Sequence, residues 1–203
     1  VDIQQFRSVF RQLKDKSGPS LTPEEAEVLK RSVALYLGEL LSGWYQEWCI
    51  LERERYRAIA MAQLDKLIQY CLAHHLYDSG IAYSMNVLTI DPTREKTHRH
   101  LMRLYYLSGD RTGALRQFQF CKQLLSQELG VEPTKRTSYL HQQIIDDHSE
   151  SVANFGQEQL SDTTKNKLTL GFRGPLFSTL TQLLGEMASV RNDIELIKQS
   201  LKK

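Results

Sequence analysis

The 203-residue sequence has few of the residues that would indicate a fibrous, disulfide-rich or membrane-spanning protein. Its 11 glycines and 5 prolines are too few for a collagen-like or low-complexity chain. Three cysteines, Cys49, Cys71 and Cys121, lie far apart without a CxxC pair, so we expect reduced, partly buried thiols in a cytoplasmic protein. No apolar run approaches the ~20 residues of a membrane-spanning helix. The first residues also lack the pattern of a signal peptide.

An excess of positive charge is also lacking. Residues 1–150 are neutral overall, and residues 151–203 carry the whole net charge of +2. DNA-binding domains usually show a strongly basic surface, so we expect none within this sequence. Because the chain begins without Met and ends abruptly on Lys-Lys, we expect it to be a piece of a longer protein.

Sequence motifs of catalysis and nucleotide binding are absent as well. The patterns GxxxxGK[ST], GxGxxG, GxSxG and HExxH do not occur. His98 and His100 are two positions apart on an expected helix, so their side chains diverge by about 200° and cannot bind one metal ion. We therefore predict that the protein is not an enzyme and has no catalytic residue, no metal site and no cofactor.

Helical periodicity, by contrast, runs through nearly the whole chain. Thr22, Pro23 and Glu25 form a helix-start signal, in which threonine caps the helix and glutamate bonds back to it. A long helix is expected over residues 44–74. No stretch alternates apolar and polar residues for long enough to indicate a sheet. The sequence therefore predicts an all-α fold.

An internal repeat of 34 residues lies within residues 62–133. Shifting the chain by this length superimposes apolar positions, such as Leu67 on Leu101, and places Gly80 on Ala114 where two helices must approach closely. A helix–turn–helix unit of 34 residues is typical of tetratricopeptide repeats. We therefore predict a tetratricopeptide-like helical array.

The residues on either side of the repeat complete the predicted organisation. Two repeats cannot bury their faces alone, so we expect helices at 44–60 and 134–148 to cap them, within a module of residues 1–148. Residues 149–175 are polar, with few large apolar side chains, and are expected to be a linker.

A coiled-coil helix is expected over residues 176–203. Its apolar residues follow one another at alternating spacings of four and three, and form an unbroken heptad seam of Leu176, Leu180, Leu183, Met187, Val190, Ile194, Ile197 and Leu201. Two pairs of opposite charge flank the seam, Glu186 with Arg191 and Asp193 with Lys198. We predict a homo-oligomer, with a dimer expected and the number of chains left open. Docking of this helix onto its own module or onto another partner is the alternative.

One helical face carries a candidate partner-binding groove. Six side chains are expected on the inner faces of the two repeats: Asp65, Gln69, Lys96, Arg99, Arg103 and Tyr106. Three cations in one groove would favour an acidic peptide, a regulatory protein or another anion. The alternatives are a solvated basic face and a face that another domain covers.

Four segments carry a resemblance to a known family: ALYLGELLSGW (34–44), EWCILERER (47–55), TIDPTREKTHRHLMRLYYLSGDRTGALRQFQ (89–119) and LGVEPTKRTSYL (129–140). Over residues 1–145 the chain resembles the bacterial transcriptional activator domain, the tetratricopeptide-like module of the Streptomyces antibiotic regulatory protein family. The resemblance implies transcription regulation through protein–protein contacts. It also implies that this module positions a winged-helix DNA-binding domain missing from this sequence, so that DNA is contacted only through that domain. A tetratricopeptide scaffold that binds acidic peptides in signalling is the alternative.

Overall fold

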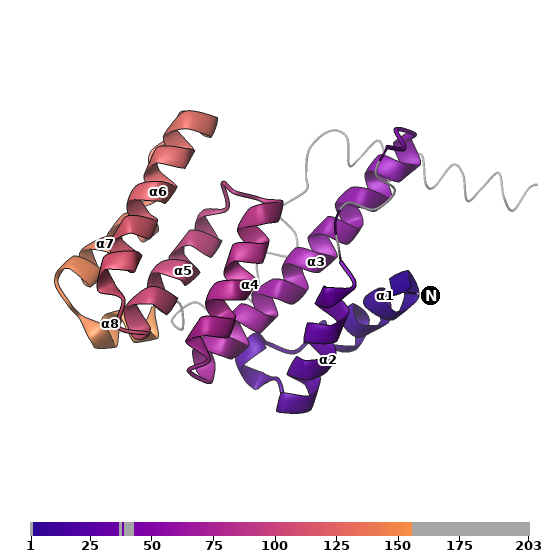
Figure 1. The fold of residues 1–203 in the computed structure, drawn as a ribbon, viewed down its shortest axis with the longest axis horizontal. Helices are drawn as coiled ribbons and strands as arrows, with labels where there is room; N and C mark the ends of the chain where they lie inside the picture. Colours follow the sequence, from indigo (N-terminus) through magenta and orange to yellow (C-terminus); the bar gives the residue numbers. More distant parts are fainter. Residues whose placement is uncertain (1, 37, 39–42, 156–203) are drawn as a thin grey trace, which may run out of the picture. The chain divides into compact units, whose positions relative to one another are not determined.

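All regular structure in the described part of the chain is helical, as predicted (Figure 1). The computed structural model describes residues 2–36, 38 and 43–155. Its elements in chain order are α1 (Asp2–Gln12), the short 3-10 helix η1 (Gly18–Ser20), α2 (Pro23–Ala34), α3 (Glu47–Ala73), α4 (Tyr77–Ile90), α5 (Glu95–Leu107), α6 (Arg111–Leu129), α7 (Lys135–Ile145) and α8 (Ser149–Asn154). The heptad helix expected over residues 176–203 lies outside the described residues.

Helices α3 to α6 form the two predicted repeats, α3 with α4 and α5 with α6. Each helix packs on the next one along the chain. Gly80 on α4 permits the close approach, because a Cβ atom there would lie 2.7 Å from Leu104 Cδ2 and 3.2 Å from Cys71 Cβ. The equivalent residue, Ala114, is fully buried. The fold is therefore the tetratricopeptide-like array that the 34-residue period predicts.

Local sequence signals set several helix ends. The hydroxyl of Thr22 accepts a hydrogen bond from the Glu25 amide at 3.3 Å, and the Glu25 carboxylate accepts one from the Thr22 amide at 3.0 Å. This is the predicted capping box at the start of α2. Gly130 ends α6 in the left-handed conformation, with φ of 67°. Helix α6 has 19 residues against 14 in α4 because this stop signal comes later in the second repeat.

The first repeat is covered by α1, η1 and α2 rather than by a separate capping helix at residues 44–60. Those residues belong largely to α3, which begins at Glu47 and continues without a break to Ala73. No glycine or proline interrupts this stretch, so nothing in the sequence ends the helix. Leu13, directly after α1, and Leu29 of α2 are buried in a core shared with Leu67 of α3.

The second repeat is covered by α7 and α8. Helix α7 packs on α6 and α5, and α8 packs on α7 and α5. Leu140, Ile144 and Val152 are fully buried in a core shared with Met102 of α5. Helix α8 occupies the first residues of the polar stretch expected to be a linker. Its one buried side chain, Val152, and two hydrogen bonds from Arg103 to its backbone attach it to the array.

Candidate partner-binding surface

Asp65 of α3 lies at the centre of a charge cluster that joins the two repeats. Its carboxylate accepts two hydrogen bonds from Arg94, at 2.7 and 2.8 Å, and one from Lys96 Nζ at 2.9 Å. Burial alone would raise the pKa of Asp65, but the bonds from Arg94 and the charge of Lys96 hold it below its ordinary value. The structure thus brings Asp65 of α3 and Lys96 of α5 together across the boundary between the two repeats, as an ion pair within the chain.

Glu95 fixes the start of α7 on α5. Its carboxylate accepts hydrogen bonds from the Thr134 amide at 2.9 Å, the Thr134 hydroxyl at 3.0 Å and the Thr137 hydroxyl at 2.6 Å. Arg99 joins the same group, because its Nη1 donates to the Thr137 hydroxyl at 2.9 Å and lies 3.9 Å from Glu95. Burial would raise the pKa of Glu95, and these hydrogen bonds together with Arg99 lower it.

Arg103 holds the C-terminal end of α8. Its Nε donates to the backbone carbonyl of Val152 at 3.0 Å, and its Nη2 donates to that of Ala153 at 2.7 Å. The end of a helix has unpaired carbonyl groups and a partial negative charge, so a guanidinium is a favourable partner. Burial, followed by the nearby charge of Arg136, lowers the pKa of Arg103 to about 10.

The two remaining residues of the predicted groove have different surroundings. The hydroxyl of Tyr106 donates to the Asp147 carboxylate at 2.6 Å, and so fixes the turn between α7 and α8. Gln69 of α3 lies against η1. A Cβ atom added at Gly18 would fall 2.5 Å from the Cβ atom of Gln69. One face of α5 therefore carries four of the six predicted residues: Lys96, Arg99, Arg103 and Tyr106. Helices α7 and α8 and the turn between them already bond to the last three.

We refer to Arg94, Lys96, Arg99 and Arg103 as the α5 cationic face. Within the described ranges, Asp65 and Glu95 are the carboxylates that lie within 4 Å of these cations, so two positive charges remain in excess. Sequence reasoning missed Arg94 and Glu95. Arg94 precedes the first turn of α5, outside the helical spacing that singled out the other cations. Arg94 could have been found by looking for a cationic partner for Asp65, the carboxylate that this fold buries.

The two histidines of α5 behave differently from one another. His98 is satisfied on both ring nitrogens, because Nε2 lies 2.8 Å from the Pro92 carbonyl and Nδ1 lies 2.6 Å from the amide of Gln117. Both ring nitrogens of His100 are buried, and no described residue forms a hydrogen bond with them. Among the residues that the structure covers, no group of three potential metal ligands comes together.

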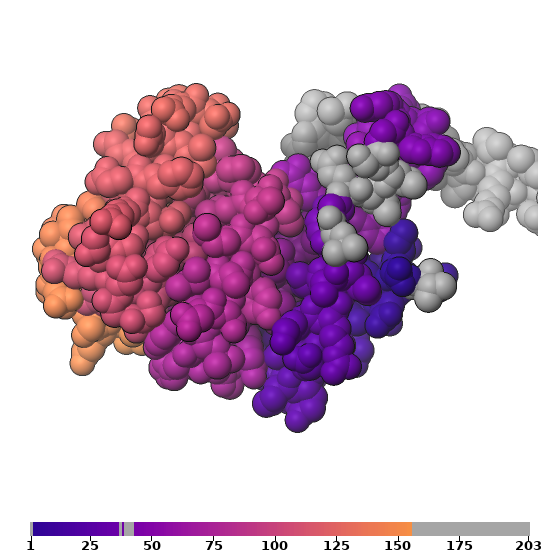
Figure 2. Space-filling model, in the orientation of Figure 1, coloured from indigo at the N-terminus to yellow at the C-terminus, as the bar shows by residue number. Residues whose placement is uncertain are grey.

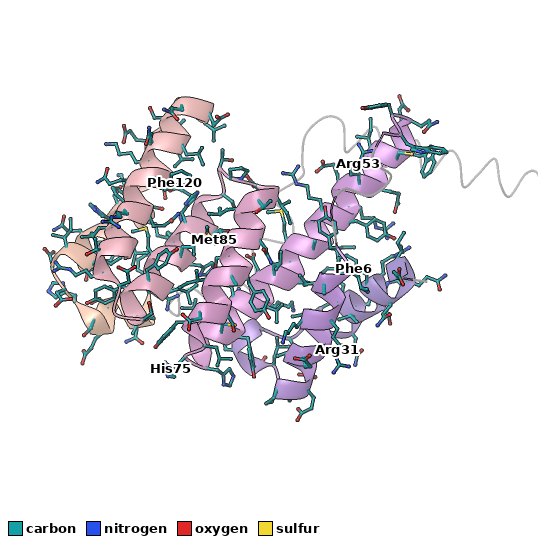
Figure 3. The ribbon with its side chains drawn as sticks, in the orientation of Figure 1. Phe6, Arg31, Arg53, His75, Met85 and Phe120 are labelled. Atoms are coloured by element: carbon teal, nitrogen blue, oxygen red, sulfur yellow. The ribbon has the colours of Figure 1, made fainter. Side chains whose placement is uncertain are left out.

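A second candidate surface lies at the beginning of α3, where this helix extends beyond its neighbours (Figure 1) and its side chains stand on the molecular surface (Figure 2). The exposed fractions of Trp44, Tyr45 and Trp48 are 54, 81 and 55%, and Leu51 is exposed as well. Arg53, labelled in Figure 3 near this end of α3, donates a hydrogen bond to the Trp44 carbonyl at 3.1 Å. The helix predicted over residues 44–74 gave no indication that Trp48 and Leu51 would be exposed.

No helix in the described part of the chain is both long and apolar enough to cross a membrane.

Comparison with known proteins relates this chain to a protein family and to a curated regulator. The family model described as the bacterial transcriptional activator domain matches residues 1–145. The regulatory protein AfsR of Streptomyces coelicolor (strain ATCC BAA-471 / A3(2) / M145) is 26% identical over 166 residues, which are 81% of this chain. The chain spans only 16% of the length of that relative. With its helical array and the match over residues 1–145, the chain belongs to the bacterial transcriptional activator domain family.

Proposed function

We propose that this chain is the regulatory and oligomerising region of a bacterial transcription factor. In the cytoplasm it acts through protein–protein contacts and by positioning a winged-helix DNA-binding domain that lies outside this sequence. The observation that carries the proposal is the family match over residues 1–145. Family membership also disfavours the alternative of a signalling scaffold with no role in transcription.

Self-association is the first part of the proposal, and the heptad seam of residues 176–203 supports it. Eight apolar residues at strict 4–3 spacing form a narrow stripe, which is typical of coiled coils rather than of helices on a globular core. Joining two chains raises the effective concentration of one DNA-binding domain once its partner is bound. Two linked DNA-binding domains would therefore bind adjacent operator half-sites more tightly than two separate domains.

Replacing Ile194 with aspartate is expected to dissociate the oligomer, because the change puts a charge into the apolar seam. Light scattering should give a multiple of the chain mass for residues 1–203 and the mass of one chain for this variant and for a 1–155 truncation. Gln199→Asp is the matched control, since it adds the same charge outside the seam and should leave the mass unchanged. A monomeric wild-type chain at micromolar concentration would contradict the proposal.

Contact with another domain is the second part of the proposal, and the exposed side chains at the start of α3 support it. Large apolar groups gathered on one projection are typical of protein–protein contact surfaces. We propose that the winged-helix domain docks on Trp44, Tyr45 and Trp48. The docking would set the distance between a DNA-binding domain and the array.

Tryptophan fluorescence is expected to report this contact, because Trp44 and Trp48 are the two tryptophans of the chain. In residues 1–203 their emission should be that of water-exposed indoles, and acrylamide should quench it readily. In a longer protein that includes the winged-helix domain, we expect emission at shorter wavelength and weaker quenching. Trp48→Phe in both proteins identifies the signal of this residue. Equal quenching of Trp48 in the two proteins would exclude docking at this surface.

A further inference from the structure

His100 lies in the middle of the α5 cationic face. It follows Lys96 by four residues and precedes Arg103 by three, so the three side chains share one side of the helix. Its ring nitrogens are buried, and no described residue bonds to them. A neutral imidazole carries one donor and one acceptor, and an imidazolium carries two donors. Leaving these groups without partners in the interior destabilises the folded state. His100 therefore has unused hydrogen-bonding capacity at a buried position.

The charge around His100 is positive. Burial, together with the charges of Lys96, Arg103 and Arg99, lowers the pKa of His100 to about 3, against the opposing effect of Asp65. The ring is consequently neutral at pH 7 and offers one N–H donor. It adds no further positive charge, so the excess of two charges on the face comes from its lysine and arginines.

Donors remain available on both sides of the histidine. Arg103 uses Nε and Nη2 on the carbonyls at the end of α8, and its Nη1 makes no bond to a described residue. Lys96 donates to Asp65 and is 45% exposed, so its ammonium group is accessible from solvent. Three donors of different kinds thus lie along two turns of α5, where no described carboxylate other than Asp65 contacts them.

We propose that Lys96, His100 and Arg103 bind a carboxylate group of an acidic peptide segment in a regulatory partner. A carboxylate oxygen would accept the His100 N–H, and the lysine and arginine would supply charge-assisted hydrogen bonds. Cations of this face already bond to a carboxylate within the chain, since Asp65 accepts hydrogen bonds from Arg94 and Lys96 at 2.7 to 2.9 Å. This inference rests on the proposed function, since it names the chemistry of one of the protein–protein contacts.

The test uses residues 1–203 and a blocked hexaglutamate peptide, with a hexaglutamine peptide for comparison, in calorimetric titrations at low salt. Hexaglutamate should bind and hexaglutamine should not. Lys96→Gln and His100→Phe should each weaken binding by tenfold or more, and the phenyl ring keeps the shape of the imidazole while removing its N–H. Lys122→Gln is the matched control, because it removes one positive charge of α6 that lies 3.1 Å from Glu132 in an exposed ion pair. It should change the affinity by less than twofold.

A second readout follows the histidine itself. In the free chain the ¹⁵N signals of the His100 ring should stay those of a neutral imidazole down to about pH 4. Bound peptide should raise the pKa of His100, because a neighbouring anion favours the imidazolium form. A merely structural role would leave this pKa unchanged.

Two outcomes would overturn the inference: no binding of hexaglutamate, whether or not inorganic phosphate binds, and undiminished binding by His100→Phe. Neither of them bears on self-association. Light scattering on Lys96→Gln and His100→Phe should give the wild-type mass whether or not the peptide binds. Failure of the carboxylate site is therefore distinguishable from failure of the proposed oligomeric function.

Discussion

Replacing Asp65 with alanine is expected to lower the free energy of unfolding by about 3 kcal/mol, the low end of the range for breaking a buried ion pair. The change leaves Arg94 and Lys96 without their shared carboxylate between α3 and α5. The low end applies because the lysine is 45% exposed and water can solvate it when the carboxylate is gone. Most of the loss should come from Arg94, which is more buried and bonds to both carboxylate oxygens.

Urea denaturation at pH 7 measures this effect. Glu132→Ala serves as the control, because Glu132 belongs to a surface ion pair with Lys122, and its loss should change the free energy of unfolding by less than about 1 kcal/mol. Equal losses in the two variants would show that the Asp65 cluster has no special role.

Acid should reduce the difference between the wild type and Asp65→Ala. The pKa of Asp65 is lowered in the folded state, so its contribution is fully present above the unfolded-state pKa of about 3.9. The contribution is lost as the pH falls through the lowered, folded-state pKa. The wild type should therefore lose more stability below pH 4 than the variant does.

Replacing Gly80 with leucine is expected to destabilise the array by about 3 kcal/mol or more, as overpacking of a close helix contact does. A Cβ atom at this position already falls 2.7 Å from Leu104 and 3.2 Å from Cys71. Leu104 is fully buried in the core cluster with Leu64 and Ile68, so those side chains would have to shift with it. Helices α4 and α5 would have to separate, and both repeats would lose core contacts.

Thermal unfolding followed by circular dichroism checks this prediction. Ser79→Leu is the matched control, since it adds the same side chain one residue earlier at an exposed position of α4. It should leave the midpoint almost unchanged or raise it slightly, because leucine favours helix more than serine does. A midpoint for Gly80→Leu within two degrees of the wild type would contradict the close packing that the repeat requires.

The fold was predictable wherever the signal was local or periodic. The capping box of Thr22, the stop at Gly130 and the small residues Gly80 and Ala114 each act within a few residues or recur at a fixed period. The covering of the first repeat by α1 and α2 was not predictable in this way. It depends on which apolar faces meet in space, as Leu13 and Leu29 meet Leu67. Helix α8 escaped notice because one buried side chain, Val152, anchors an otherwise polar segment.

The candidate surface shows the same division. The spacing of Lys96, Arg99 and Arg103 placed them on one face of α5, but their partners lie far along the chain. Arg99 bonds to Thr137, 38 residues later, and no pattern of spacing links the two. Arg103 bonds to carbonyl groups of the backbone, which every residue carries, so its partners leave no trace in the sequence.

This attachment of α8 through its backbone has a mechanical consequence. A pull on the chain beyond residue 155 would be carried by the Phe155 ring, which stacks on Tyr139 and lies under Arg136, and then by the two hydrogen bonds from Arg103. Arg111 forms a second such clamp, with bonds of 3.0 and 2.6 Å to the carbonyls of Ile144 and Ile145 at the end of α7. Two arginines, placed one after the other along the path of the load, thus resist the peeling of α8 and then of α7 from the second repeat.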